Sequence, residues 1–288
     1  GFAVAIGYRA GQTSQQEGAV SVGYIAGSVN QNNYALALGT SAGREYQGTH
    51  AIAIGAYAGT QNQGSQAIAI GLGSGDTGQG VNTTAAGNFA GQTTQGDYAS
   101  ALGRDAGRSF QGVYACAFGH RAAFNNQEPY AVAVGTDAGR LSQNTLCTSI
   151  GYRAGESYQD NNSVAIGYQA GQCYQGSKSV ALGNEAGRSN QGDYSIAIGS
   201  GAGNNQASKT IILSASQTAF SNTTAANGGF FVQPIRNAPD TNALYYNPTT
   251  KEITYDVGGG GGGSQTLQEV TDLGATTGNE IAFTNVTT

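Results

Sequence analysis

The sequence predicts an all-β fold, a parallel β-solenoid of 16-residue coils, on three observations. Short apolar runs of the type Ala-Ile-Ala-Ile recur along the chain, and each is closed by a glycine. A second glycine follows four residues after this first glycine, and a glutamine follows eight residues after the first glycine. Repeats of fixed length without insertions indicate identical units stacked on one another, as in solenoid proteins.

The apolar runs predict the strands of the solenoid. In residues 51–54 and 67–70, isoleucine alternates with alanine, which favours a β-strand; the spacing of 2 and the density of glycine exclude a helix. The thirteen glycines that end these runs, here called the closing glycines, are spaced 16 residues apart. They are Gly7, Gly23, Gly39, Gly55, Gly71, Gly87, Gly103, Gly119, Gly135, Gly151, Gly167, Gly183 and Gly199.

Each coil has a second glycine and a predicted second strand. The second glycine usually follows an alanine, with Ser74 as the exception, and only Ala123 interrupts the series. We expect a second short extended segment around Tyr8 to Ala10 and at the equivalent positions of the other coils. Two strands and two or three corners make one coil of a narrow solenoid, and neighbouring coils pair about 4.8 Å apart.

A glutamine occupies the same position in all twelve full repeats, which predicts a column of stacked side chains. Stacked amides hydrogen-bond to one another in cross-β structures, whereas the alternative is a solvated turn residue. The next residue is usually glycine and sometimes Asn32, Asn144 or Asp160, types that tolerate positive φ and indicate a corner. The glutamines are Gln15, Gln31, Gln47, Gln63, Gln79, Gln95, Gln111, Gln127, Gln143, Gln159, Gln175 and Gln191.

The apolar runs also predict an interface between chains. Successive residues of a strand point to opposite sides, so we expect the larger residues to fill the interior and the alanines to face outward. An alanine stripe along a rod would be a large exposed apolar patch in a monomer, so we infer a parallel homo-oligomer with closed symmetry. With the two faces exchanged, the argument for an interface still holds. The predicted inward set is Ile52, Ile54, Ile68, Ile70, Val132, Val134, Ile196 and Ile198, and the outward set is Ala51, Ala53, Ala67, Ala69, Ala131 and Ala133.

The repeat resembles two groups of fibrous proteins. The sequence Ser-Val-Ala-Ile-Gly-Tyr-Gln-Ala-Gly at 163–171 is similar to the head repeat of YadA-type trimeric adhesins, and this similarity covers residues 1 to about 207. The resemblance implies a left-handed parallel β-roll with three chains side by side. The repeat length and the Gln-Gly corner depart from that family and resemble the long repeats of predicted fibre proteins of giant viruses and tailed phages. The segments 229–236 and 244–255 resemble the same viral proteins.

We predict four segments in the chain. Residues 1–207 form the solenoid shaft, 208–256 a capping and neck region of β-structure, 257–264 a glycine-rich linker, and 265–288 the start of a further small module. Because the sequence starts and stops within a pattern, we expect more chain beyond both ends. Strands are expected at 209–213, 230–235, 243–246 and 252–255, a short helical or coiled segment at 267–273, and a strand at 281–283.

Composition excludes several classes of function. Only 10% of the residues are charged, and the net charge of −5 includes no basic stripe, which argues against nucleic-acid binding. No apolar run approaches the roughly 18 residues that span a membrane. The three cysteines, Cys116, Cys147 and Cys173, are too few and too irregular for a disulfide or zinc framework, so we expect buried or half-buried fillers.

The sequence predicts no enzyme, no cofactor and no metal site. His50 and His120 have no partner at ligand spacing, which favours solvated surface residues. The regular acids Asp105, Asp137 and Glu185 are each followed three residues later by arginine, which predicts ion pairs across a corner or between chains. A glycosidase would need two acids about 5 to 10 Å apart in a cleft, and no insertion is present to build one.

Tyrosines recur just before the apolar runs and have two interpretations. Exposed tyrosine near asparagine and glutamine is typical of surfaces that contact carbohydrate; the alternative, which we favour, is that the rings pack against the repeats beside them. These residues are Tyr34, Tyr98, Tyr114, Tyr130 and Tyr194.

Together these features predict a structural shaft of an extracellular or virion surface fibre that associates with itself as a parallel homotrimer. Such a fibre contributes to host attachment by contact with a host glycan or protein and with other virion proteins. The alternatives are the head of a bacterial trimeric autotransporter adhesin and a polysaccharide-degrading spike.

Overall fold

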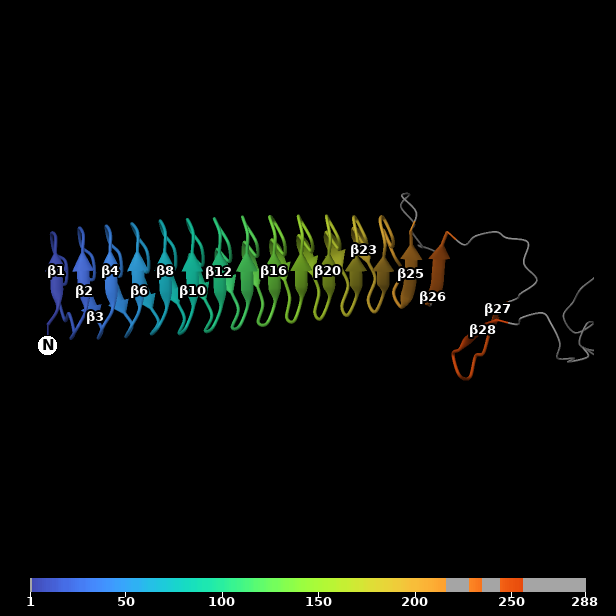
Figure 1. Ribbon diagram of the computed structural model, residues 1–288, viewed down its shortest axis with the longest axis horizontal. Coiled ribbons are helices and arrows are strands. Elements are labelled where there is room, and N and C mark those ends of the chain that lie inside the picture. Colours follow the sequence, from blue (N-terminus) through green and yellow to red (C-terminus); the bar gives the residue numbers. More distant parts are fainter. Residues whose placement is uncertain (1, 216–227, 235–243, 256–288) are drawn as a thin grey trace, which may run out of the picture. The chain divides into compact units, whose positions relative to one another are not determined.

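The computed structural model describes residues 2–215, 228–234 and 244–255, and the chain divides into two units, Gly1–Ile235 and Arg236–Thr288. The first unit is a parallel β-solenoid, and no helix occurs in the described ranges (Figure 1). This confirms the all-β parallel solenoid that the repeat predicts. The left hand of the coil stays a prediction.

One strand of each coil belongs to a 15-stranded parallel sheet, the first sheet, which contains the apolar runs. Each coil pairs with the next in register with the repeat, for example Ala53 with Ala69 and Ile54 with Ile70. In spatial order the strands are β1 (Val4–Ile6), β2 (Val20–Val22), β4 (Leu36–Leu38), β6 (Ile52–Ile54), β8 (Ile68–Ile70), β10 (Thr84–Ala86), β12 (Ser100–Leu102), β14 (Cys116–Phe118), β16 (Val132–Val134), β18 (Thr148–Ile150), β20 (Val164–Ile166), β22 (Val180–Leu182), β24 (Ile196–Ile198), β25 (Thr210–Ser214) and β26 (Gly229–Gln233).

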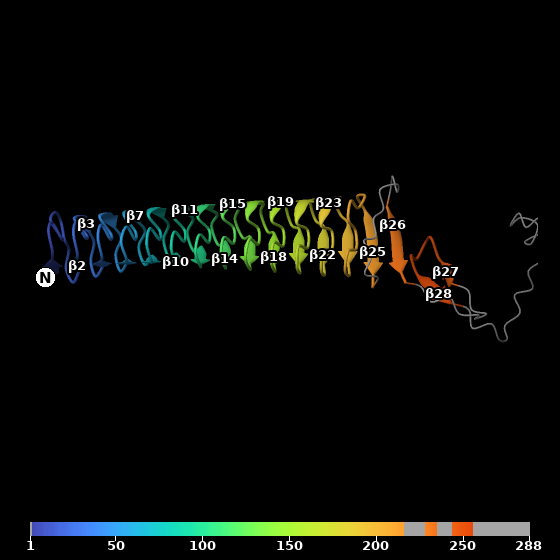
Figure 2. The same cartoon turned by 90° about the horizontal axis from the view of Figure 1, so that it is seen from above.

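The other strand of each coil belongs to an 11-stranded parallel sheet, the second sheet, on the opposite side of the coil (Figure 2). Its strands end at the repeated glutamines, so that Gln47 pairs with Gln63. They are β3 (Val29–Gln31), β5 (Glu45–Gln47), β7 (Gln61–Gln63), β9 (Thr77–Gln79), β11 (Thr93–Gln95), β13 (Ser109–Gln111), β15 (Asn125–Gln127), β17 (Leu141–Gln143), β19 (Ser157–Gln159), β21 (Cys173–Gln175) and β23 (Ser189–Gln191).

The prediction of a second strand around Tyr8 to Ala10 is therefore wrong. These residues form a turn, and Arg9 and Gly11 have φ values of 54° and 56°. Left-handed residues cannot continue an extended strand, so the chain turns here and becomes extended again only at the residues that lead to the glutamine.

The interior of the coil is filled by alanine, so the predicted assignment of the two strand faces is wrong. A coil this short, which also encloses a glutamine side chain, has room only for small side chains on its inner strand face, alanine in most coils and serine at Ser21 and Ser149. Isoleucine at the alternate positions is therefore directed outward. The alanines at 51, 53, 67, 69, 131 and 133 are 0% exposed, whereas Ile52, Ile54, Ile68, Val132 and Ile196 are half-buried and Ile70, Val134 and Ile198 are exposed.

The repeat changes at the C-terminal end of the solenoid. β25 overlaps the altered strand predicted at 209–213, beginning and ending one residue later, and pairs with β24 at a spacing shorter than the regular period, Ile196 with Ile211. Ile212 takes the inward position that alanine holds elsewhere, is 0% exposed, and packs against Phe231 of β26. A larger side chain thus replaces the inner alanine where the repeat becomes irregular.

In the second unit the structure describes one hairpin. β27 (Leu244–Tyr246) and β28 (Ile253–Tyr255) pair antiparallel. In the connecting turn, the Asn247 side chain accepts hydrogen bonds from the N–H groups of Thr249 and Thr250 at 2.9 and 3.1 Å. The predicted linker at 257–264 and module at 265–288, with its helical segment and strand, lie outside the described residues.

Candidate functional site

The closing glycines allow the coils to stack closely at the end of each strand of the first sheet. Gly55, Gly103 and Gly167 have φ values of 126°, 125° and 132°, a region that residues with a side chain rarely adopt. A Cβ on Gly103 would lie 2.7 Å from the carbonyl oxygen of Gly119 in the next coil. Both conformation and space therefore require glycine.

The glycine after each glutamine does not have the positive φ that the sequence predicts. Gly48 and Gly64 lie outside the left-handed region, and so do Asn144 and Asp160. A Cβ on Gly64 would lie 2.4 Å from the carbonyl oxygen of Gly80, so glycine is present there because the coils approach closely. Positive φ occurs instead at residues with large side chains, among them Tyr46, Tyr57 and Tyr158.

The glutamines form a hydrogen-bonded column inside the solenoid. Gln47, Gln111 and Gln175 are no more than 2% exposed. Nε2 of Gln111 donates to the carbonyl oxygens of Ser100 and Ala115, at 3.0 and 3.3 Å, and to Oε1 of Gln127 at 3.1 Å. The same amide–amide bond, at 3.0 to 3.2 Å, joins Gln31 to Gln47, Gln47 to Gln63, Gln79 to Gln95, Gln95 to Gln111, Gln127 to Gln143, Gln143 to Gln159, Gln159 to Gln175, and Gln175 to Gln191.

Within the described residues, the column has two breaks and one member that the period did not reveal. No bond joins Gln63 to Gln79, whose Oε1 has no partner, and Gln15 is connected to Gln31 only through Oγ of Ser21. Gln206 accepts from Nε2 of Gln191 at 3.3 Å and continues the column at a spacing shorter than the regular period. A search that allowed one deletion in the last coil would have found it.

Acidic and arginine side chains form the ion pairs that the sequence predicts across a corner. Arg108 lies 3.2 Å from Asp105, and Arg188 lies 3.4 Å from Glu185. The pairs also connect coils, because Asp137 contacts Arg121 of the preceding coil at 3.1 Å as well as Arg140 at 3.8 Å. These groups belong to a structural network along the rod.

Aromatic side chains stack between coils in columns that run along the rod. In the predicted column Tyr114 lies between Tyr98 and Tyr130, with centroid separations of 4.9 and 5.2 Å. Tyr34 stacks on His50 instead, and Tyr194 lies over Lys178. All five predicted tyrosines are 47 to 55% exposed, so stacking and solvent exposure coexist in this column.

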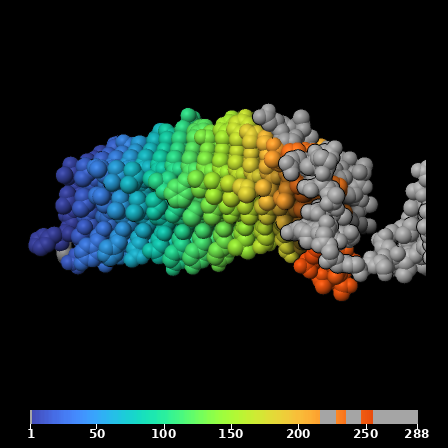
Figure 3. Space-filling view, turned by 45° about the vertical axis from the view of Figure 1, so that its right-hand side comes forward, coloured from blue at the N-terminus to red at the C-terminus, as the bar shows by residue number. Residues whose placement is uncertain are grey.

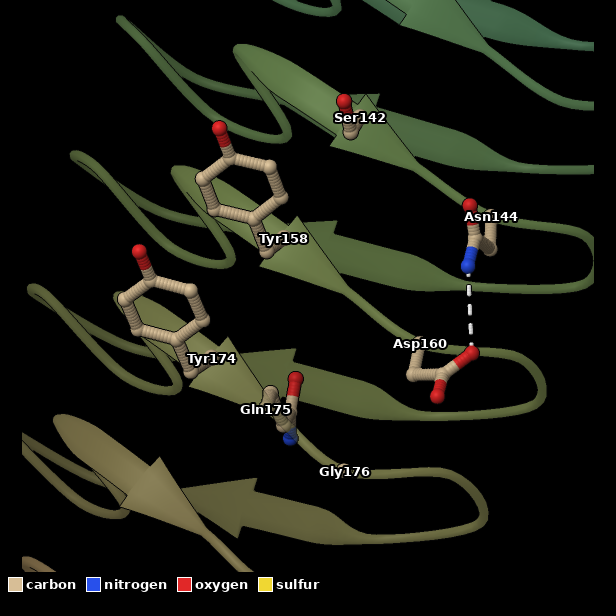
Figure 4. Close-up of a pocket in the computed structure, with 7 residues that line it drawn as sticks. All are labelled: Ser142, Asn144, Tyr158, Asp160, Tyr174, Gln175 and Gly176. Carbon is tan, nitrogen blue, oxygen red and sulfur yellow. Dashed lines mark hydrogen bonds between the residues drawn. The ribbon is translucent and has the colours of Figure 1, made fainter.

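A second aromatic column on the second sheet borders a surface pocket, and sequence reasoning did not single it out. Tyr158 and Tyr174 stack with centroids 5.1 Å apart and an angle of 5° between their planes. The pocket beside them has a volume of about 340 Å³ and includes Ser142, Asn144 and Asp160. Nδ2 of Asn144 donates to Oδ1 of Asp160 at 3.1 Å (Figure 4). The signal was in the sequence, as Tyr158 and Tyr174 lie one period apart.

The outer face of the first sheet is a long apolar surface, here called the apolar face. It consists of the first and third residues of the three-residue strands, of which the third are generally the more exposed, and Thr84, Ser100 and Thr148 are its polar members. Successive coils follow one another as regular rows of atoms along the first unit (Figure 3). Those exposed by 37 to 42% are Leu38, Ile70, Leu102, Phe118, Val134, Ile150, Leu182 and Ile198.

The cysteines are free thiols; Cys147 is buried, and Cys116 and Cys173 are half-buried, as expected of small fillers. Burial raises the pKa of the Cys147 thiol. Over the described ranges, no group of three or more His, Cys, Asp or Glu side chains could hold a metal ion. No helix in the same part of the chain is long and apolar enough to cross a membrane.

The comparisons with known proteins connect the repeat to one family over a short segment. Residues 191–202 match the YadA head domain repeat, in two copies. No curated protein and no solved structure matches the chain. The matched residues include the last glutamine of strict period, Gln191, and the apolar run of β24, so the chain carries YadA head-type repeat sequence in its solenoid.

Proposed function

We propose that the chain is the rod of an extracellular attachment fibre in which three parallel copies pack side by side through the apolar face. The observation that carries this proposal is the apolar face itself, which follows the first sheet along the stacked coils. An exposed apolar surface of this extent marks an interaction site. Its period matches that of an identical chain, so a parallel copy offers the same side chains at the same spacing.

The match to the YadA head domain repeat supports this proposal, since YadA-type heads are trimeric surface adhesins. It favours the head of a bacterial adhesin at least as strongly as a virion fibre. The length of the coil and the internal glutamine favour the viral setting, because they depart from the YadA-type repeat. Neighbouring genes for capsid or tail proteins would support the viral fibre, and a downstream membrane-anchor segment would support the adhesin.

The proposed function is mechanical and involves no catalysis. The column of buried amides, the ion pairs between coils and the stacked rings all act along the rod, and they hold each coil on the next. A polysaccharide-degrading spike is the competing hypothesis. Incubation with candidate glycans tests it, because cleavage would produce new reducing ends.

The deciding experiment is the oligomeric mass of the purified chain, measured by light scattering after size-exclusion chromatography. We expect a mass of three chains. The double variant Ile70→Asp/Leu102→Asp should have the mass of one chain, because burying two carboxylates in an apolar interface is strongly unfavourable. A stable, soluble wild-type monomer would overturn the proposal.

A matched control separates the interface from general effects of added charge. Phe110 is apolar and 59% exposed, but it lies on the second sheet. The Phe110→Asp variant should keep the trimeric mass. Circular dichroism of all variants should show unchanged β-structure, because every substituted side chain lies outside the alanine interior.

A further inference from the structure

The second sheet carries an aromatic column that ends abruptly at Tyr158. The rings of Tyr158 and Tyr174 lie parallel with centroids 5.1 Å apart, but the preceding coil has Ser142 at the same position. The side of the Tyr158 ring that is directed toward Ser142 therefore has no aromatic neighbour (Figure 4). Ser142, Tyr158 and Tyr174 all line the pocket of about 340 Å³.

Hydrogen-bonding groups line the same pocket. Asn144 and Asp160 occupy the corner that follows the strand, in the coils of Ser142 and Tyr158 respectively (Figure 4). Asp160 is held in place, because its Oδ1 accepts from Nδ2 of Asn144 at 3.1 Å and from the backbone N–H of Asn161 at 2.8 Å. A carboxylate offers about four acceptor sites, so accepting capacity remains for a ligand.

We propose that this pocket binds a neutral hexose unit of a glycan, stacked on the exposed ring of Tyr158 and hydrogen-bonded through its hydroxyl groups to Asp160 and Asn144. A sugar ring has one apolar face and a polar rim. Those two parts match an aromatic face with a carboxylate and an amide at its side. The carboxylate of Asp160 selects a neutral sugar, because it repels a sugar acid and accepts strong hydrogen bonds from hydroxyl groups.

The proposal does not depend on the trimer. The pocket lies on the second sheet, whereas the apolar face lies on the first sheet, on the other side of the coil (Figure 2). The pocket also differs in position from the predicted glycan column of Tyr34 and Tyr98, which precedes the strands of the first sheet.

The experiment is saturation-transfer difference NMR on the whole chain. The probes are the methyl glycosides of glucose, galactose and mannose, with glucuronic acid as the anionic comparison. We expect saturation of at least one neutral glycoside and none of the acid. Asp160→Ala should weaken binding by about tenfold or more, since a hydrogen bond to a charged group alone has that effect. Tyr158→Ala should also weaken binding by about tenfold or more, because it removes the ring on which the sugar stacks. Tyr158→Phe should bind as the wild type does, because the phenol hydroxyl is directed away from Asn144 and Asp160 (Figure 4).

Two further variants make the test specific. Ser142→Tyr should abolish binding without unfolding the chain, because the new ring would extend the stack; φ at Ser142 is 54°, close to the 57° of Tyr158. Tyr46→Ala is the matched control, since Tyr46 holds the same position in another coil, is 56% exposed, and is followed at the corner by Gly48 instead of Asp160. It should leave binding unchanged.

Three outcomes would overturn the proposal. They are no saturation of any neutral glycoside by the wild-type chain, equal saturation of glucuronic acid, and unchanged binding in the folded Ser142→Tyr variant. The oligomeric mass measured by light scattering is an independent readout, so failure of the sugar site and failure of the trimer can be told apart.

Discussion

At the scale of single residues, the buried glutamines show how a polar side chain becomes part of the core. The amide of Gln111 donates to the carbonyl oxygen of Ala115, four residues later in the chain, and to that of Ser100, 11 residues earlier. It also bonds to Gln127, the glutamine of the next coil, and most of the other glutamines make the same kinds of bond. Because a buried amide is costly unless its groups are paired, the glutamine of each neighbouring coil helps to keep this arrangement favourable.

Replacing Gln111 with alanine should lower the free energy of unfolding by about 3 kcal/mol, since an unpaired buried polar group costs about 1–3 kcal/mol and several are left. Guanidinium denaturation measures the change. Gln61→Ala is the control, because Gln61 is half-buried on the outside and makes one bond of 3.4 Å to Glu45. Its effect should stay within about 0.5 kcal/mol, as is usual for a surface substitution. Equal effects of the two variants would contradict the role of the column.

The closing glycines allow a second prediction at the same scale. Gly103→Ala should lower the free energy of unfolding by about 3 kcal/mol, because backbone strain and the overlap with Gly119 each cost about 1–3 kcal/mol. Gly78→Ala is the matched control: φ is 72°, but the nearest atoms, in Thr94, are 3.8 Å from the new Cβ. It should cost about 1 kcal/mol, the strain alone. Thermal unfolding of both variants checks the difference.

The Asp160 carboxylate gives a pH dependence with a defined sign. The N–H of Asn161 and the amide of Asn144 lower its pKa in the folded chain. Its contribution to stability is therefore present above the unfolded pKa of about 3.9 and is lost as the pH falls through the lower folded pKa. Denaturation between pH 2 and pH 5 should show a steeper loss of stability for the wild type than for Asp160→Asn, and identical slopes would contradict the assignment.

At the scale of the element, the short length of the coil fixes what can lie inside it. The inner columns consist of alanine at the strand and at the turn, such as Ala101 and Ala106, and both are 0% exposed. The larger aliphatic residues therefore face outward, where they form a surface instead of a core. The same small interior explains why Ile212 appears only where the repeat ends.

This packing predicts that enlargement of an inner alanine is harmful. Ala101→Val should lower the free energy of unfolding by about 1–3 kcal/mol, because added methyl groups in a filled interior force neighbouring atoms apart. In the control Ala56→Val the side chain is half-buried at a turn position that holds Leu72 in the next coil, so the change should be near zero. Denaturation midpoints compare the two, and a neutral Ala101→Val would show that the interior has unfilled space.

At the scale of the whole molecule, the solenoid is a one-dimensional stack in which each coil contacts its neighbours. Pairing proceeds from each coil to the next, as in the series of Ala85 with Ala101 and Ala101 with Ala117. The number of coils can therefore change without loss of the fold, whereas the number of residues in each coil cannot.

Duplicating residues 99–114 should give a folded chain whose rod is longer by about 4.8 Å, the spacing of one strand pair. Duplicating only 99–106 should disrupt the fold, because it would place the residues of one column against those of another and break the glutamine bonds. Small-angle scattering and circular dichroism distinguish the results. Disruption by the duplication of the whole coil would contradict the stack of equivalent coils.

The period, the strands of the first sheet, the parallel stacking and the glutamine column could all be predicted from the amino-acid pattern, because a strict repeat places equivalent residues on one another. The ion pairs of Asp105 with Arg108 and of Glu185 with Arg188 also followed from spacing alone, since each pair lies across a single corner.

Three features could not be predicted and depend on how the folded coils pack: which strand face is inside, where the second strand lies, and why glycine follows most of the glutamines. The alternation in Ala-Ile-Ala-Ile does not indicate whether the alanines or the isoleucines lie inside the coil. That depends on the volume that remains inside once the chain has closed around Gln63 and its equivalents. The pocket at Tyr158 and Asp160 likewise exists only because stacking places Ser142 beside the ring of Tyr158, and no single coil contains that arrangement.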